Sequence, residues 1–559
     1  MSTTLNTFLR SRNPVDPGDS DSKKDLGFVV ENTDVGFDSD LASDINPGEL
    51  TFDEDTAGGM GRHLGVFSCT MLIVGSIIGT GIFSTPSSIL GSVGSVGASL
   101  MLWVAGLLLS FCGLFVWLEF GTMFPRSGGE KVYLEAVYRR PKHLATVVFA
   151  ANAIILNFSS SNCIVKHLTS PKSILLSAGR TADLWAVRGI AIGVIVFTVS
   201  LHGFAPRLGV YVLTLFKIII LLFIVVTGWV VLSGKTSVED PHANFRHAFA
   251  GSSNNSNDYA TAMFKVLFSY AGWQDANYVL NEVKDPVRTI KIAGPLGLGI
   301  TSALYIFANI AYFAASSKAD ILKSGTTVAS LFFGNVFGTN AQKALTVFVA
   351  LRYVLGAAVL TCADMPSQAY SAARVNQELA KEGIPLPFGN RIWASNWPTQ
   401  NAPFPGLIVH LISTVIVIIA PPPQVAYPFI LDVSGYPEQI IDLFVILGLF
   451  YLRWAKPRLP RPFKGTFALN SSRYINPMAN TKLRMLVAPF IRPPDGIGDT
   501  PPLPYYLYCL IGIAVMVVGM LYWAVWKLAF PYIFGFCLVP RKETLPDGTV
   551  VTLASLLFL

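Results

Sequence analysis

Stretches of about twenty apolar residues recur along this 559-residue chain and limit what it can fold into. About 20 apolar residues cross a bilayer core as a helix. Only 13% of the residues are charged, about half the usual share in soluble domains. A soluble enzyme, a disordered chain and a disulfide-stapled secreted domain are therefore excluded, and we expect an all-α, polytopic membrane protein. Eleven spans are predicted, at 65–90, 97–122, 143–165, 185–204, 208–233, 260–282, 293–316, 342–365, 404–421, 427–453 and 505–528.

The chain is expected to have four parts. In residues 1–60 acidic residues outnumber basic ones thirteen to four, which predicts a disordered acidic tail. Residues 61–453 would form a ten-helix transport core, residues 454–530 the region of helices 11 and 12, and residues 531–559 a C-terminal tail. Lys23 and Lys24 are candidate ubiquitin acceptors, with ubiquitin-ligase machinery as the partner.

Lysine and arginine gather in alternate loops, such as the one holding Arg126, Lys131 and Arg139. Basic loops stay inside the cell, so the N-terminus is predicted to be cytoplasmic. The six cysteines are scattered singly, which indicates no metal site, disulfide framework or cofactor. No basic-aromatic stripe suggests a nucleic-acid partner.

The first predicted span is interrupted by glycine. Gly79 and Gly81 flank Thr80 near its middle, and each glycine weakens a helix by about 1 kcal/mol relative to alanine. Unwinding there would free backbone N–H groups at the N-terminal end of the following half-helix, which suits a carboxylate. The alternative is close helix packing, because Gly75 and Gly79 also form a small-xxx-small pattern.

The sixth span has a similar interruption at Phe268-Ser269-Tyr270-Ala271-Gly272, followed by polar residues. Freed carbonyl groups of Phe268, Ser269 and Ala271 could hold an ammonium group, and Phe268 could close over the ligand. A polar helix face directed at other helices remains an alternative.

The two interruptions lie five spans apart, at the first positions of two five-span halves. Secondary transporters built on inverted repeats bind their substrate between two such broken helices. Amide donors for an anion and carbonyl acceptors for a cation would fit the zwitterion of an α-amino acid.

These residues resemble a known family. Residues 75–83 and 119–130 look like signatures of the amino acid–polyamine–organocation superfamily, L-type amino acid transporter branch. Residues 268–286 resemble its sixth helix and the exit from it. Residues 374–383 and 496–502 look like the fungal high-affinity methionine permease branch.

The resemblance implies twelve transmembrane helices with a 5+5 inverted-repeat, leucine-transporter-like core and discontinuous helices 1 and 6. By position, Gly79, Thr80 and Gly81 would contact the substrate carboxylate. The residues that would contact the amine or gate the site are Ile77, Phe268, Ser269 and Ala271.

Lys217 lies in the middle of the fifth span, where an unpaired charge costs several kcal/mol. In sodium-independent relatives, a lysine at the matching place replaces a sodium ion, so the resemblance implies a coupling role. A lysine that snorkels or pairs structurally is the alternative.

Two segments depart from the family pattern. Helix 11 is expected to be disrupted, because residues 465–482 are polar and the apolar run at 483–491 is too short to cross a bilayer. Residues 166–172 interrupt the end of the third span. A gene-model error would explain both.

The predicted function is secondary active transport of neutral L-amino acids, with methionine uptake, proton symport and the plasma membrane implied. The partners would be the amino acid, protons and membrane lipid. A non-transporting amino acid sensor and an inactive product of a faulty gene model remain alternatives.

Overall fold

The protein is described from a computed structural model. The described residues are 62–79, 81–156, 206–236, 238–254, 256–324, 331–338, 375–386, 389–396, 404–419, 423–463, 475–491, 503–546, 548–558 and a few isolated positions. The predicted spans at 185–204 and 342–365, the acidic tail with its two lysines, and residues 166–172 lie outside this set.

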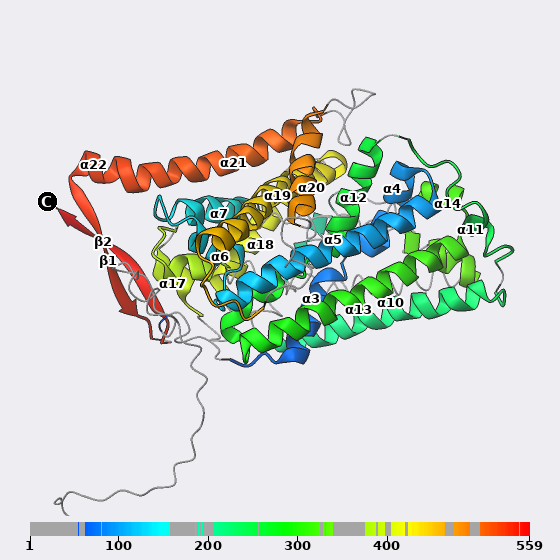
Figure 1. Ribbon diagram of the computed structural model, residues 1–559, viewed down its shortest axis with the longest axis horizontal. Coiled ribbons are helices and arrows are strands. Elements are labelled where there is room, and N and C mark those ends of the chain that lie inside the picture. The colour runs from blue at the N-terminus through cyan, green and yellow to red at the C-terminus, as the bar shows by residue number, and fades with distance from the viewer. Residues whose placement is uncertain are drawn as a thin grey trace, which may run out of the picture. The chain divides into compact units, whose positions relative to one another are not determined.

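Long apolar helices dominate the described chain, which confirms a mostly helical membrane protein (Figure 1). Four of them are long and apolar enough to cross a bilayer. They are α5 (Val96–Met123), α13 (Pro286–Ala315), the Gly435–Ala455 part of α19 (Pro423–Ala455), and Leu507–Phe534, which joins α21 (Leu507–Ala524), η4 (Val525–Ala529) and α22 (Phe530–Phe534).

The other helices whose bounds the structure gives lie outside these four spans. They are α3 (Val66–Ile77), α4 (Gly81–Val93), α6 (Glu130–Val137), α7 (Leu144–Ile155), α10 (Pro206–Leu232), α11 (Ala243–Arg246), α12 (Ser256–Tyr270), η1 (Asp275–Glu282), α14 (Lys318–Ser324), α17 (Asn390–Ala394), α18 (Phe404–Ile419), α20 (Ile475–Val487) and η3 (Ala488–Phe490).

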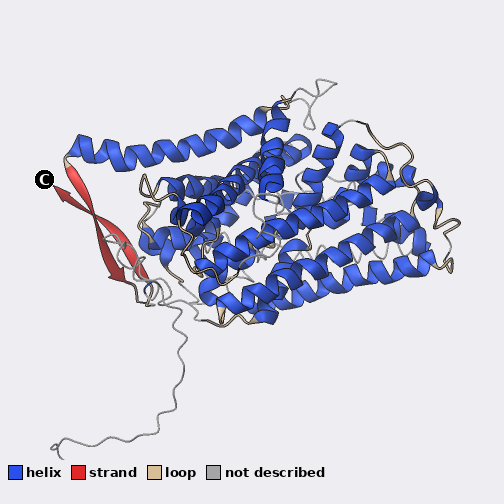
Figure 2. Ribbon diagram, in the orientation of Figure 1, coloured by secondary structure: helices blue, strands red, loops and turns tan. Residues whose placement is uncertain are grey.

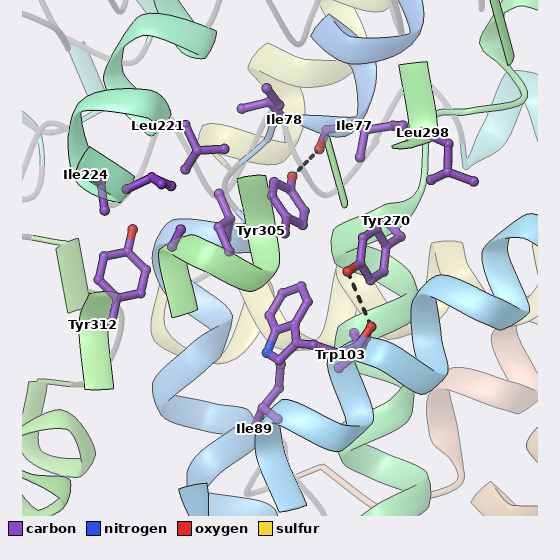
Figure 3. Packing of buried hydrophobic residues seen from close by; sticks show 14 of the residues in the cluster. Ile77, Ile78, Ile89, Trp103, Leu221, Ile224, Tyr270, Leu298, Tyr305 and Tyr312 are labelled. Atoms are coloured by element: carbon purple, nitrogen blue, oxygen red, sulfur yellow. Dashed lines mark hydrogen bonds between the residues drawn. The ribbon is translucent and has the colours of Figure 1, made fainter. Parts of the chain in front are cut away.

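Helices that are distant in sequence pack together around α3. The α3 helix contacts α10 and α13, and α12 contacts α4 and α5 (Figure 1). Trp103, Tyr270 and Tyr305 join three of these helices, with ring centroids 5.4 to 5.7 Å apart (Figure 3). Aromatic pairs at this spacing contribute beyond their buried area, so they fix how α5, α12 and α13 meet.

The C-terminal residues form a β-hairpin, the strand pair that Figure 2 shows in red. Strands β1 (Phe536–Thr544) and β2 (Val550–Phe558) pair antiparallel, with Phe536 opposite Phe558. The sequence analysis predicted no strand here, so the described chain is mostly rather than entirely α-helical.

The atypical segment before α21 includes a described helix, α20, which packs on α19. Its 13 residues reach about 20 Å, which is short of a bilayer core of about 30 Å. Lys482 of α20 donates hydrogen bonds to Asp442 at 2.8 Å and to Gln439 at 2.5 Å on α19. A polar residue of α20 thus binds polar residues of α19.

A buried ion pair ties α5 to the end of α19. The Glu119 side chain is only 1% exposed and accepts two hydrogen bonds from the Arg453 guanidinium. Arg461 lies 3.6 Å away from the same carboxylate. A buried acid with this many cationic partners is a structural anchor.

We expect Arg453→Met to lower the free energy of unfolding by about 3 kcal/mol, because it leaves Glu119 buried with a weaker partner. Thermal unfolding of the purified protein in detergent measures the effect. The matched control is Arg391→Met, which removes an exposed pair with Glu543 and should cost less than about 1 kcal/mol. Equal losses in the two variants would contradict this role of Arg453.

Candidate substrate site

The first helix is interrupted between α3 and α4. The α3 helix ends at Ile77, Ile78 leaves helical geometry with ψ of 86°, and α4 begins at Gly81. Thr80 lies outside the described residues. The carbonyl of Ile77 accepts a 2.6 Å hydrogen bond from the hydroxyl of Tyr305 (Figure 3), so a side chain replaces the helix bond lost at this end.

The sixth helix is interrupted between α12 and η1. The α12 helix ends at Tyr270, and η1 begins at Asp275. Gly272 between them has φ of +117°, a backbone conformation that residues with a side chain rarely adopt. This glycine therefore permits the chain to leave one half-helix and enter the next.

The two interruptions lie against each other. A Cβ atom on Gly81 would lie 2.6 Å from the Ser269 hydroxyl, and a Cβ atom on Gly272 would lie 2.8 Å from the backbone of Ser76. Thr85 also reaches across, with its hydroxyl 3.0 Å from that of Ser269. The structure thus brings the predicted site residues Gly81 and Ser269 into contact and places Ile77 at the end of the same half-helix.

The half-helices present opposite partial charges. At the N-terminus of α4, amide groups point toward the interruption, and the C-terminus of α12 supplies carbonyl groups. One predicted acceptor is partly used, because the carbonyl of Phe268 accepts a 3.2 Å hydrogen bond from the amide of Ala271. The arrangement can favour an anion at one end of a ligand and a cation at the other.

Lys217 lies behind the first interruption. Its side chain is 3% exposed, and its ammonium group donates a 2.8 Å hydrogen bond to the carbonyl of Gly75 on α3. A positive charge on α10 is therefore held against the C-terminal end of α3, where the helix dipole favours it.

Sequence reasoning missed three residues beside these interruptions. Thr85 and Tyr305 stand in stretches that give no sign of their partners. Asp275 was visible as a polar residue after the sixth-span glycine but received no role. It is 5% exposed and lies against the side chain of Ser76.

A further buried acid, Glu130, begins α6 in the connection between α5 and α7. Its side chain is 5% exposed and accepts a 2.8 Å hydrogen bond from the indole of Trp117. Burial raises the pKa of Glu130 to about 7, although hydrogen bonds from Tyr278 and Trp117 favour the ionised form.

Comparison with known proteins identifies the family of this chain. Residues 64–519 match the model of the amino acid permease family, a range that contains both interruptions. This chain belongs to the amino acid permease family. The membership confirms the resemblance found in the sequence, and it confirms an amino acid transporter rather than an enzyme.

Relatives of the permease cover most of its length. It is 35% identical over 538 residues to the high-affinity methionine permease of Saccharomyces cerevisiae, covering 95% of this chain and 89% of that protein. It is 32% identical to the low-affinity methionine permease of the same yeast, covering 88% and 87%. It is 28% identical to the human b(0,+)-type amino acid transporter 1, covering 81% and 86%.

We expect Gly81→Ala to reduce amino acid uptake by the permease about tenfold or more, because the added methyl group would collide with Ser269. Uptake of labelled substrate, normalised to surface expression, measures this. Gly299→Ala is the matched control, since no heavy atom lies within 4 Å of its Cβ position on α13. Normal uptake by Gly81→Ala would show that this contact is not needed.

The raised pKa of Glu130 makes stability depend on pH. The folded protein binds this proton more tightly than the unfolded chain, so its stabilising contribution is present below about pH 4.5 and is lost as pH rises toward about 7. We expect the melting temperature of the purified permease to fall across this range, and to fall less in Glu130→Gln. An unchanged pH profile in that variant would contradict the assignment.

Proposed function

We propose that this permease imports neutral L-amino acids, with methionine as its main substrate, and that protons drive the import. The contact between the two interrupted helices carries the proposal. Gly81 and Ser269 bring the N-terminus of α4 against the C-terminus of α12, so backbone dipoles of opposite sign meet at the two interruptions. We call the place where the two interruptions meet the gap. A zwitterion has the two charges that such a gap favours.

Methionine follows from the relatives and from the chemistry around the gap. The two yeast relatives above are named methionine permeases, and the alignments with this chain cover 89% and 87% of their lengths. The described residues around the interruptions include the apolar Ile77, Ile78 and Phe268. An uncharged, flexible side chain like that of methionine suits such neighbours.

The residue roles follow the same geometry. We assign the substrate carboxylate to the backbone amides of Gly79, Thr80 and Gly81. We assign contact with the substrate amine, or gating of the site, to Ile77, Phe268, Ser269 and Ala271. Lys217 would act in coupling as the charge that links α10 to α3.

The remaining topology completes the proposal. Twelve helices with two inverted five-helix repeats, a cytoplasmic N-terminal tail of residues 1–60 and a plasma membrane location fit import from outside the cell. Lys23 and Lys24 in that tail would accept ubiquitin and set the lifetime of the permease at the surface.

Uptake of labelled methionine tests the proposal. Cells lacking their own methionine transport and expressing this permease should accumulate methionine, and excess unlabelled methionine should compete better than lysine or aspartate. Acidifying the medium should speed uptake, because more protons are then available outside.

The control for this test is the same cell with Gly81→Ala, which is expected to reach the surface without transporting. Methionine uptake no faster than in cells without the permease would overturn the substrate assignment. Uptake that ignores a proton gradient and proceeds only by exchange would overturn the symport part.

A further inference from the structure

Four acidic side chains gather beside the substrate site. They are Asp275 on η1, Glu130 on α6, and Glu438 and Asp442 on α19, and together we call them the acidic cluster. Glu438 interacts electrostatically with each of the other three. Lys482 forms an ion pair with Asp442 at 2.8 Å, so its charge is already engaged at one end of the cluster.

Asp275 is the member of the acidic cluster that borders the gap. It follows Gly272, whose backbone packs against Ser76 at the end of α3, and its carboxyl group lies against the Ser76 side chain. It is 5% exposed, and its Oδ2 atom accepts no hydrogen bond from any described residue. Within the described chain, no lysine, arginine or histidine lies within ion-pair distance of it.

The charged groups on the elements that pack against η1 are exposed or engaged elsewhere. On α5, Glu119 is bound by Arg453. On α13, Lys291 donates to the carbonyl of Pro462 at 2.8 Å, and Arg288 is exposed. On η1 itself, Glu282 lies 3.8 Å from His63. Glu438 of α19 is therefore the charged neighbour that acts on Asp275, and it has the same sign.

Gln274, the residue before Asp275, contacts a solvent-accessible acid. The side chain of Gln274 accepts a 3.1 Å hydrogen bond from the amide of Gly272 and lies 3.5 Å from the Glu438 carboxylate. Glu438 is exposed, whereas Asp275, one residue after Gln274, is buried. A proton that leaves Asp275 thus has an acid with access to water as its neighbour.

We propose that Asp275 is the residue that carries the coupled proton, and that Glu438 is the group through which this proton exchanges with water. The inference rests on proton-driven methionine import and adds the residue that binds the proton. The Asp275 carboxylate binds and releases this proton reversibly, and the transfer needs no other reactant.

Coupling arises because the substrate carboxylate and Asp275 border the same gap. Two anions close together in a site of low dielectric constant repel each other strongly. A proton on Asp275 removes this repulsion, so a protonated Asp275 favours the bound zwitterion. By thermodynamic reciprocity, the bound zwitterion favours the proton equally.

Purified full-length permease in liposomes tests the proposal. Methionine exchange, methionine accumulation driven by a proton gradient, and acidification of the lumen on adding methionine are measured for each variant. We expect Asp275→Asn to exchange methionine but to lose gradient-driven accumulation and the acidification. Its affinity for methionine should no longer change with pH.

Three further variants make the result specific. Asp275→Glu keeps a carboxyl group and should retain proton-driven accumulation. Asp320→Asn changes an exposed acid on α14, away from the acidic cluster, and should behave as the unmodified permease. Glu438→Gln should slow acidification of the lumen more than it slows exchange.

The outcomes separate this inference from the proposed function. Asp275→Asn that still accumulates methionine and acidifies the lumen would overturn the assignment while leaving symport intact. Asp275→Asn that neither exchanges nor binds methionine, judged by methionine-dependent thermal stabilisation, would assign Asp275 to binding or folding and also overturn it. An unmodified permease that neither exchanges nor accumulates methionine would overturn the proposed function itself.

Discussion

The contact between the two interrupted helices is the constraint on which the rest of this structure depends. Backbone that leaves a helix at membrane depth must satisfy its polar groups within the protein, because lipid offers no hydrogen bonds. Here each interruption is covered by the other. Gly81 lies against Ser269, and Gly272 lies against Ser76. Both glycines therefore lie where a side chain would push the two interrupted helices apart.

The end of α3 is held from two further sides. Tyr305 of α13 donates to the carbonyl of Ile77, and Lys217 of α10 donates to the carbonyl of Gly75. Both bonds satisfy carbonyl groups in the last turn of the helix, where intrahelical partners are missing. The open end of α3 is thus stabilised by α10 and α13 while the opposite side stays available to α12. The end of this half-helix is thus held in place, and fixed dipoles favour a charged ligand without having to reorganise.

Glycine and polar residues inside apolar runs were sufficient to predict where both helices break, because the cost of unwinding is local. The partners that cover the breaks were not predictable in the same way. Tyr305 stands in an apolar stretch of α13, and only the packing of α13 on α3 gives its hydroxyl group an acceptor. The C-terminal hairpin did leave a signal, since Pro546-Asp547-Gly548 is a typical turn and an apolar run follows it. It was overlooked beside the much stronger periodicity of the spans.

The two buried charged residues near the gap are placed for different tasks. Lys217 is bound to a helix end whose dipole favours its positive charge. Asp275 faces the Ser76 hydroxyl group and a second acid instead, and no cationic side chain of the described chain forms an ion pair with it. A carrier needs one group whose charge stays and another whose charge can change when the ligand arrives. The difference in partners supports the proposal that Asp275 carries the charge that changes, while Lys217 supplies the charge that stays.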